Sequence, residues 1–335
     1  MDEIIRDGDA IVSKHNFIFY AFGYEHPEDS IIAFLKYVPN EYREYFRIPW
    51  LEYKWEFQGI PLTRPSELYS PRTYPAVIEG LRRISPKYLY EDKIIGKPIV
   101  VVPKDLIKKV FFPRKRLQKL LNKKNLDPLE TKAINLIKLL SDKSGVSIAD
   151  FGIHGSISLG MHTEKSDIDI SVYGAENFKR VKKSAAELDE DGLIVLSKGN
   201  QIERIRCNRG AYEEKNFVFN ATRKNEEITD QYGGRSYKAI RPLKFSCQVV
   251  NADEAMFRPA KYHIENYVPL NRSYEIEKKP KTVVSMIGEF RDIAKAGDRI
   301  KVQGMLERVE GKGTTYRVVV GSGFGKEYIW PENSE

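Results

Sequence analysis

Residues 151–174, FGIHGSISLGMHTEKSDIDISVYG, decide the expected fold at the centre of this chain. The apolar residues before Gly155 predict a strand that ends at Gly155-Ser156. A polar loop follows, and a second strand is predicted from Asp167. Side chains alternate between the two faces of a strand. Asp167 and Asp169 are therefore expected on one face, while the isoleucines and the valine between and after them pack into the core.

The spacing of the two aspartates suits divalent metal ions. Residues i and i+2 of a strand lie roughly 6.5–7 Å apart, so their carboxylates can converge on shared ions. Mg²⁺ (or Mn²⁺) prefers carboxylate oxygens and substrate phosphates, and two such ions form the clamp used in nucleotidyl transfer. Gly155 has no Cβ and lets the backbone approach a triphosphate, while Ser156 offers a hydroxyl and an N–H to an anion. We therefore expect Asp167 and Asp169 to be the catalytic, metal-binding residues, and Gly155 and Ser156 to bind the nucleotide.

A structural alternative is that both aspartates are merely exposed strand residues and that Gly155-Ser156 is an ordinary turn. Aspartate is depleted in strands, and two unpaired carboxylates on one face would repel each other. The pair therefore favours metal binding over this alternative.

Helices and further strands are expected around this segment. Asp127 suits an N-cap and Pro128 the first helical position. Apolar residues then recur at helical spacing: Leu129, Ala133, Leu136, Ile137 and Leu140. Residues 176–188 predict a second helix, and residues 193–196 and 243–250 predict strands. The centre of the chain is thus expected to be an α/β (α+β) core.

These residues resemble the signature of the polymerase β-like nucleotidyltransferase superfamily: a hydrophobic strand, Gly-Ser, a loop, and Asp-hydrophobic-Asp on a strand. Here ten residues separate Ser156 from Asp167, which fits that signature. The closing Val172-Tyr173-Gly174 is similar to the group of predicted archaeal nucleotidyltransferases. The close resemblance covers residues 152–174 and extends more loosely over residues 127–267.

The resemblance implies a metal-dependent transfer of a nucleoside monophosphate from an NTP to an acceptor hydroxyl, with release of pyrophosphate. It implies that Asp167 and Asp169 hold Mg²⁺ or Mn²⁺ and that Gly155 and Ser156 bind the β- and γ-phosphates. RNA is the first expectation for the acceptor.

The sequence departs from the superfamily in its third carboxylate, which active members usually present on a later strand. The strand expected at residues 243–250 has other polar residues where an acid would stand: Ser246, Cys247 and Gln248. The remaining candidates are Glu203, in a strand suggested at residues 201–206, and Asp253 and Glu254, just beyond residues 243–250. Two alternative functions therefore stay open. One is a catalytically silent nucleotide- or RNA-binding regulator that retains the fold, and the other is a protein-modifying (antitoxin-type) transferase.

Residues 1–110 predict a β-rich N-terminal domain whose many aromatic residues suit either packing in a small sheet or stacking on bases. A basic run from Lys104 to Lys124 holds nine lysines and arginines and one acid, and is expected to be a helix that leads into a core at residues 111–270. Such a run can bind RNA or another polyanion through phosphates, or be the solvated face of a helix.

Residues 271–335 predict a small C-terminal β-domain of short strands separated by glycine-containing turns, with a barrel as one arrangement. The glycine-rich stretches at residues 310–315 and 321–325 lack the full patterns of a phosphate loop or a dinucleotide loop. Both are interpreted as turns.

Composition excludes several classes of protein. A chain of 335 residues with 41% hydrophobic and 30% charged residues is long enough for two or three globular domains and too apolar for disorder. Two cysteines without a Cys-x-x-Cys pair argue against a disulfide framework or a zinc ribbon. An acidic start without an apolar stretch, and no long apolar run, predict a cytoplasmic protein without a membrane segment. The net charge of +8 permits a polyanionic partner.

Overall fold

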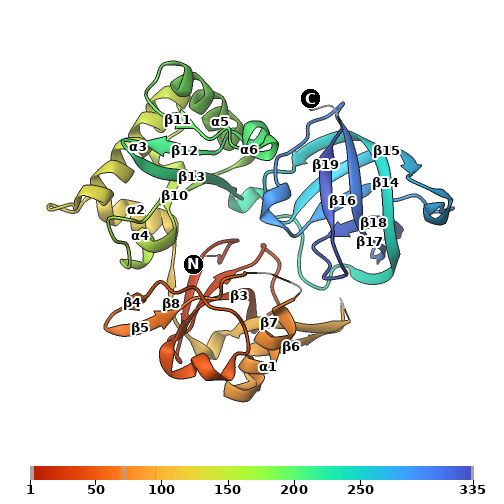
Figure 1. Ribbon diagram of the computed structural model, residues 1–335, viewed down its shortest axis with the longest axis horizontal. Coiled ribbons are helices and arrows are strands. Elements are labelled where there is room, and N and C mark those ends of the chain that lie inside the picture. Colours follow the sequence, from red (N-terminus) through yellow and green to blue (C-terminus); the bar gives the residue numbers. More distant parts are fainter. Residues whose placement is uncertain (1–3, 69, 71, 95, 333–335) are drawn as a thin grey trace.

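The computed structural model describes residues 4–332 except 69, 71 and 95. It consists of three lobes, each built around its own sheet of eight, five or six strands (Figure 1). The N-terminal lobe lies below the other two in this view, and the C-terminal lobe lies beside the central one. The expected fold class, an α/β core between two β-rich flanks, is confirmed.

The N-terminal lobe is an eight-stranded sheet with one α-helix, α1 (Tyr74–Ile84). Its strands are β1 (Ala10–Ser13), β2 (Ile18–Ala21), β3 (Ser30–Pro39), β4 (Trp55–Phe57), β5 (Ile60–Thr63), β6 (Leu89–Asp92), β7 (Lys97–Pro103) and β8 (Ile107–Phe111). The main path runs β4-β5-β3-β2-β1-β8, and β7 joins β3 to β6.

Both faces of the central strands in this sheet are covered, which explains their unbroken apolar sequence. Every residue of β1 and β2 is buried. Ile11 and Phe19 belong to the core that α1 covers. Val12 and Ile18 point to the opposite face and pack in a cluster with Leu159 of the central lobe, so this second face is an interface between lobes.

The central lobe is a five-stranded sheet in the order β11-β12-β13-β10-β9. Its strands are β9 (Phe151–Ile153), β10 (Ile168–Tyr173), β11 (Val195–Leu196), β12 (Arg209–Tyr212) and β13 (Lys215–Thr222). Its helices are α2 (Pro113–Leu121), α3 (Pro128–Ser144), α4 (Gly155–Leu159), α5 (Ala175–Glu190) and α6 (Gln201–Arg206). The apolar faces of α3 and α5 pack on one face of the sheet in a single core.

The helix expected after Asp127 is confirmed as α3. The side chain of Asp127 accepts a hydrogen bond from the backbone N–H of Glu130, and the Glu130 carboxylate accepts one from the backbone N–H of Asp127. This reciprocal capping box begins the helix. Gly145, with φ of +62°, ends it in the left-handed conformation.

Three local expectations differ from the structure. Residues 201–206 form helix α6 rather than a strand, and Asn200 caps it. The neighbour of β10 is the unexpected strand β13. The basic run at residues 104–124 is not one helix, because its first half forms a 3₁₀ turn and strand β8. Pro113 then begins α2, since proline suits a first helical position and keeps the preceding residue extended.

The C-terminal lobe is a closed six-stranded barrel. Its strands are β14 (Ser236–Glu254), β15 (Ala260–Pro269), β16 (Thr282–Ser285), β17 (Arg299–Glu310), β18 (Thr314–Val320) and β19 (Tyr328–Pro331). They are ordered β14-β15-β16-β18-β17-β19, and pairing of β14 with β17 closes the barrel. The sheet therefore begins at Ser236, and the boundary expected after residue 270 falls inside it.

Candidate active site

Asp169 lies on the face of the central sheet that α3 and α5 leave uncovered. Ile168, Ile170 and Val172 of β10 are at most 1% exposed and face the helices. Asp169 points to the opposite face and is half-buried, whereas Asp167, just before β10, is exposed. The neighbouring strand β9 is antiparallel, and the backbone N–H of His154 at its end donates to the carbonyl oxygen of Asp169 at 2.8 Å. The alternation expected from the sequence is present.

The carboxyl group of Asp169 is surrounded by charges of both signs. Burial has the largest effect and raises its pKa above the ordinary value. The positive charge of Lys36 lowers the pKa, and the negative charge of Asp167 raises it. Arg64 and Arg209 lower it further, yet the pKa of Asp169 remains raised. A buried carboxylate beside another carboxylate is stabilised in its charged form by an added cation.

Gly155 brings the backbone directly against this carboxylate. Its φ is +63°, in the left-handed region, and a Cβ at this position would overlap Oδ2 of Asp169. Only glycine therefore fits without displacing the aspartate. Ser156, which follows in the first turn of α4, is half-buried. The structure thus places Gly155 against Asp169, and Ser156 is the next residue along the chain.

His154 fixes the turn that precedes Gly155. The backbone N–H of Gly155 donates to Nδ1 of His154 at 2.6 Å. Burial lowers the pKa of His154 to about 4, and the charge of Lys36 acts in the same direction, so the ring is neutral at pH 7. A neutral ring that accepts at Nδ1 carries its proton on Nε2. The hydrogen bond of this imidazole to the backbone of Gly8 therefore links the turn to the N-terminal lobe.

The N-terminal lobe contributes two cations that sequence reasoning missed. Lys36 of β3 lies with Nζ 4.0 Å from the centre of the Tyr20 ring, and this ring packs edge-on against His154 at 5.0 Å. Arg64 follows β5, and its buried Nε has no hydrogen-bond partner among the residues that the structure describes. Burial lowers the pKa of Lys36 to about 8, while Asp169 opposes this shift. No local motif marks either residue, because only the packing of the two lobes brings them to Asp169.

Strand β13 occupies the position next to Asp169 where a third carboxylate was expected. It runs parallel to β10, with Val218 opposite Asp169 and Asn220 opposite Ser171. On the other side of β13, Arg209 of β12 lies opposite Val218. Directly opposed residues share a face of the sheet, so Asp169, Val218 and Arg209 form one row. This face of β13 therefore presents no acid.

The three acids suggested by the sequence are engaged elsewhere. Glu203 on α6 accepts a hydrogen bond from Ser197 at 2.6 Å. Asp253 pairs with Lys179 at 3.2 Å. Glu254 pairs with Arg223 at 2.8 Å. Residues 243–250, where a third acid was sought, belong to β14 of the barrel and not to the central sheet.

Several cations of the basic run have internal partners. Arg114 pairs with Asp150 at 2.7 Å and lies over the Tyr173 ring at 3.8 Å. Arg116 and Lys123 both pair with the buried carboxylate of Glu130. The other lysines of the run are exposed: Lys104 in the 3₁₀ turn, Lys108 and Lys109 on β8, Lys115 and Lys119 on α2, and Lys124 after α2.

A second group of metal-ligand residue types surrounds the start of α3. Asp127, Glu130 and His162 have ligand atoms within 4.8 Å of one another. His162 contacts Asp127 through Nε2 at 2.7 Å, and Glu130 is already neutralised by two cations. Burial raises the pKa of Asp127, but hydrogen bonds from the Glu130 backbone and His162 outweigh it and leave the pKa lowered. These contacts explain the group as a helix cap.

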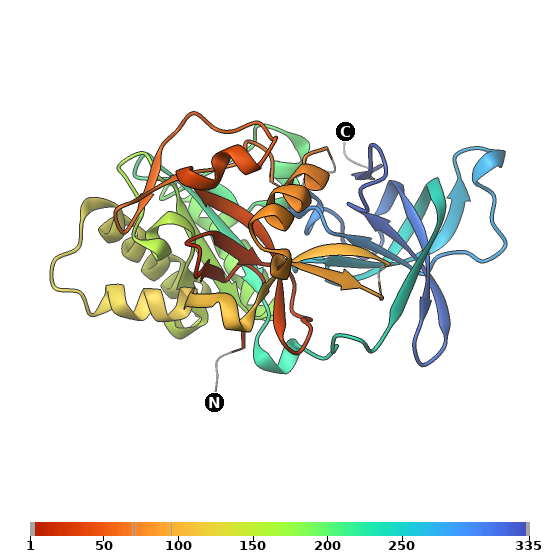
Figure 2. The same cartoon turned by 90° about the horizontal axis from the view of Figure 1, so that it is seen from below.

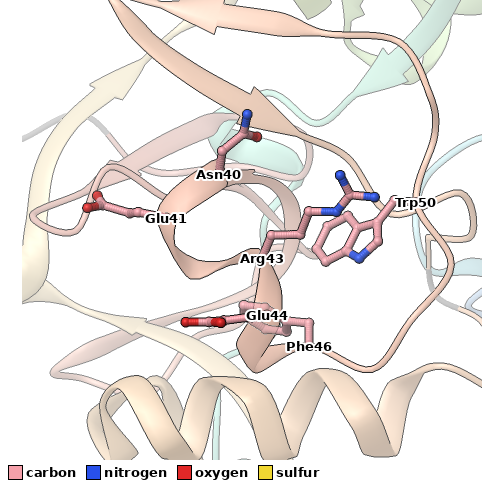
Figure 3. A pocket seen from close by; sticks show the side chains of 6 residues that line it. All are labelled: Asn40, Glu41, Arg43, Glu44, Phe46 and Trp50. Carbon is pink, nitrogen blue, oxygen red and sulfur yellow. The ribbon is translucent and has the colours of Figure 1, made fainter.

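A shallow hollow of about 420 Å³ lies on the N-terminal lobe, away from Asp169 (Figure 3). Its lining residues are Asn40, Glu41, Arg43, Glu44, Phe46 and Trp50. Figure 3 shows the Arg43 side chain beside the Trp50 ring, and the guanidinium carbon of Arg43 lies 5.7 Å from the ring centre. None of the residues that line this hollow belongs to the candidate active site.

Comparison with known proteins agrees with this geometry. Residues 134–231 match the family model of the nucleotidyltransferase domain, and the match ends just before the barrel. An uncharacterized protein from Methanocaldococcus jannaschii is 29% identical, with 95% of this chain and 96% of that protein aligned. No solved structure matches significantly. Residues 134–231, most of which belong to the central lobe, therefore match a nucleotidyltransferase domain, which is consistent with the polymerase β-like superfamily.

The helices were also compared with the length of a membrane span. Among the described residues, no helix combines the length and apolar character needed to cross a bilayer.

Proposed function

We propose that this protein transfers a nucleoside monophosphate from an NTP to an acceptor hydroxyl in a divalent-metal-dependent reaction. The observation that carries the proposal is the contact between Gly155 and Asp169, where a tight backbone turn faces a buried carboxylate next to Asp167. The family match supports transferase chemistry of this general kind.

Asp167 and Asp169 would hold Mg²⁺ or Mn²⁺. The fit rests on their oxygen ligands and on the raised pKa of Asp169, because burial and its neighbour Asp167 disfavour its ionised form without a cation. When bound, such ions polarise the phosphates and neutralise the leaving group. The turn at Gly155-Ser156 then orients the β- and γ-phosphates through backbone and hydroxyl groups.

The cations of the N-terminal lobe complete the donor site. Lys36 and Arg64 face Asp169 closely enough to lower its pKa. Preorganised positive groups stabilise the negative charge that develops on a transferred phosphoryl group. We therefore assign Lys36 and Arg64 to the phosphates of the NTP.

The reaction exchanges one phosphorus–oxygen bond for another. The acceptor oxygen attacks the α-phosphorus, and a new O–P bond forms. The bond from the α-phosphorus to the oxygen that bridges to the β-phosphate breaks, and pyrophosphate leaves with that electron pair. The proton of the acceptor hydroxyl passes to water.

A silent nucleotide-binding regulator is the second candidate function. It is favoured by strand β13, which presents Val218 and Asn220, rather than an acid, beside the aspartates. Such a protein would bind NTP through the same turn but would not turn it over.

Incubation with α-labelled NTPs and Mg²⁺ or Mn²⁺ separates the two candidates. Transferase activity predicts pyrophosphate release and label transfer that Asp169→Asn abolishes. The matched control is Asp142→Asn, because Asp142 is an exposed aspartate on α3 of the same lobe. Tight NTP binding without turnover in the unmodified protein would favour the regulator instead.

RNA is the first candidate acceptor, through the exposed lysines of residues 104–124. Each phosphate contact releases counterions, so RNA affinity should fall steeply as salt concentration rises. Substitution of Lys115 and Lys119 by glutamine should reduce the slope of log affinity against log salt concentration. If the RNA affinity of the unmodified protein does not change with salt concentration, this run is not an RNA site.

A further inference from the structure

Three arginines gather on the side of Asp169 that faces away from the Gly155 turn. Arg209 lies two strands from Asp169 in the same row of the sheet and lowers the pKa of that aspartate. Arg206, at the end of α6, is near enough to Arg209 for their charges to interact. Arg291, which comes from the barrel, donates to Oδ1 of Asn220 on β13 at 2.9 Å.

These arginines have little negative charge to balance them. Within the described residues, neither Arg206 nor Arg291 is within 4.0 Å of a carboxylate oxygen, and the buried Nε of Arg206 has no hydrogen-bond partner. The acid that acts most strongly on Arg206, Asp292, is bound to Lys182 at 2.6 Å, and Glu289 has a smaller effect. Among the described residues, Arg291 donates to the neutral oxygens of Gly288 and Asn220, and the charge of Asp7 opposes the lowering of its pKa. Arg209 approaches Glu203 at 3.7 Å.

The cluster is electrostatically unfavourable as it stands. Burial lowers the pKa of Arg291 to about 9, and the charges of Arg258 and Arg206 act in the same direction. Burial and Arg209 likewise lower the pKa of Arg206. Arg258 has its own partner, Asp7, at 2.8 Å. Half-buried guanidinium groups that repel each other are stabilised when an anion binds among them.

The order of the strands indicates which substrate this anion belongs to. The sheet runs β12-β13-β10-β9, so the Gly155 turn after β9 and the arginines at β12 and β13 lie on opposite sides of Asp169. In a displacement at phosphorus, the attacking oxygen and the leaving oxygen are roughly in line. If the β- and γ-phosphates lie at the turn, the acceptor approaches from the side of the arginines.

We propose that the acceptor carries a phosphate group close to its reactive hydroxyl, and that Arg206, Arg209 and Arg291 bind this phosphate. The proposal rests on the nucleotidyl transfer proposed above. It names the acceptor as a phosphate ester, in the form of a polynucleotide end or a single nucleotide. Arginine suits this role because its planar donors match phosphate oxygens.

Equilibrium binding tests the proposal without turnover. The protein is first saturated with a non-hydrolysable NTP analogue, and a labelled oligoribonucleotide with a free 3′-hydroxyl is then titrated into it. AMP and adenosine are tested separately as competitors of the labelled strand. The variants are Arg209→Gln, Arg206→Gln and Arg291→Gln. The control is Arg204→Gln, because Arg204 is exposed on the same helix, α6. Thermal unfolding of each variant identifies any that misfolds, and Arg209, with 55% of its side chain exposed, is the substitution least coupled to folding.

Loss of one charged hydrogen-bond donor should weaken oligoribonucleotide binding by about tenfold in Arg209→Gln and Arg206→Gln. Affinity for the NTP analogue should be unchanged in these variants, and Arg204→Gln should resemble the unmodified protein. If AMP competes as strongly as the unlabelled strand, the acceptor is a single nucleotide. If only the strand competes, the acceptor is a polynucleotide.

The proposal is overturned if adenosine competes as well as AMP, if neither the strand nor AMP binds, or if the arginine variants bind as the control does. Failure of the NTP analogue to bind the unmodified protein would instead reject the nucleotidyl transfer on which the proposal rests.

Discussion

Asp169 has three cationic neighbours, and its pKa is nevertheless raised. Burial has the largest effect and raises the pKa, the charge of Lys36 lowers it, and the charge of Asp167 raises it. A cation bound beside this carboxylate would favour its ionised form, so the proposed metal binding would be coupled to the charge of Asp169. Because Asp169 lies in close contact with Gly155, the proposed metal site is next to the backbone turn that would hold the nucleotide.

Replacement of Gly155 by alanine should abolish nucleotidyl transfer. Its Cβ would overlap Oδ2 of Asp169 and displace the carboxylate. Gly160→Ala is the matched control, because Gly160 has a φ of +70° but no heavy atom within 4 Å of the added Cβ. Both substitutions should cost roughly 1 kcal/mol of stability through the left-handed backbone. Label transfer by the two variants is compared, and equal activity would contradict the assigned role of Gly155.

His154 should make the stability of the fold depend on pH. Its pKa is about 4 in the folded protein and 6.5 when unperturbed, because burial disfavours the charged ring. Between these values the unfolded chain binds a proton that the folded chain does not. Stability is therefore fully present above pH 6.5, falls as pH is lowered toward 4, and then levels off. The loss should reach up to about 3 kcal/mol.

Chemical unfolding at a series of pH values measures this loss. His154→Gln should flatten the dependence, and part should remain because burial also lowers the pKa of His26 to about 4. His263→Gln is the control, since His263 is exposed. If the free energy of unfolding of His154→Gln changed with pH as it does in the unmodified protein, the imidazole would not be buried in its neutral form.

At the level of elements, the strand–turn–strand containing Gly155 and Asp169 could be predicted because its signal is local. Alternation, glycine and the aspartate spacing all lie within residues 151–174. Strand β13 was not predicted, although its buried residues Phe217, Phe219 and Ala221 recur at every second position. The third acid was instead expected in the strand at residues 243–250, and that strand pairs within the barrel.

If Asp167 and Asp169 hold a metal ion as proposed, the neighbouring strand β13 should affect how tightly it binds. Val218→Asp would place a third carboxylate directly opposite Asp169, beside Arg209. One additional oxygen ligand should tighten Mn²⁺ binding, by about tenfold on the scale of one charged contact. Titration calorimetry measures the affinity, and Val218→Asn controls for polarity without charge. Equal affinities in the two variants would mean that position 218 does not reach the metal.

At the scale of the whole molecule, the three lobes are joined by side chains distant in sequence. Leu159 and Met161 of the central lobe pack against the N-terminal sheet. Met256 and Phe257, in the connection between β14 and β15, are buried in the core of the central lobe. Figure 2 shows the N-terminal lobe in front of the central one and the barrel extending to one side. Lys36, Arg64 and Arg291 reach the site only through this assembly, so no local sequence pattern could identify them.

The buried pair of Asp7 and Arg258 should be a main link between the N-terminal lobe and the barrel. Nε of Arg258 donates to Oδ1 of Asp7 at 2.8 Å, and the same oxygen accepts from the backbone N–H of Gly23 at 2.9 Å. The two side chains are 14% and 6% exposed. Asp7→Asn removes the charge while keeping the size, and should cost about 3 kcal/mol because a buried guanidinium loses its carboxylate.

Denaturant unfolding and transfer activity together test this link. Asp105→Asn is the control, because Asp105 pairs with Lys87 on the surface, where both side chains are more than half exposed, and its loss should leave stability unchanged. If the lobes act as one unit, Asp7→Asn should also lower activity, since the docking that positions Lys36 and Arg64 is weakened. Normal stability together with lost activity would place Asp7 in the chemistry rather than in the docking. Normal stability with normal activity would mean that the apolar contacts of Leu159, Met161, Met256 and Phe257 are sufficient to hold the lobes in place.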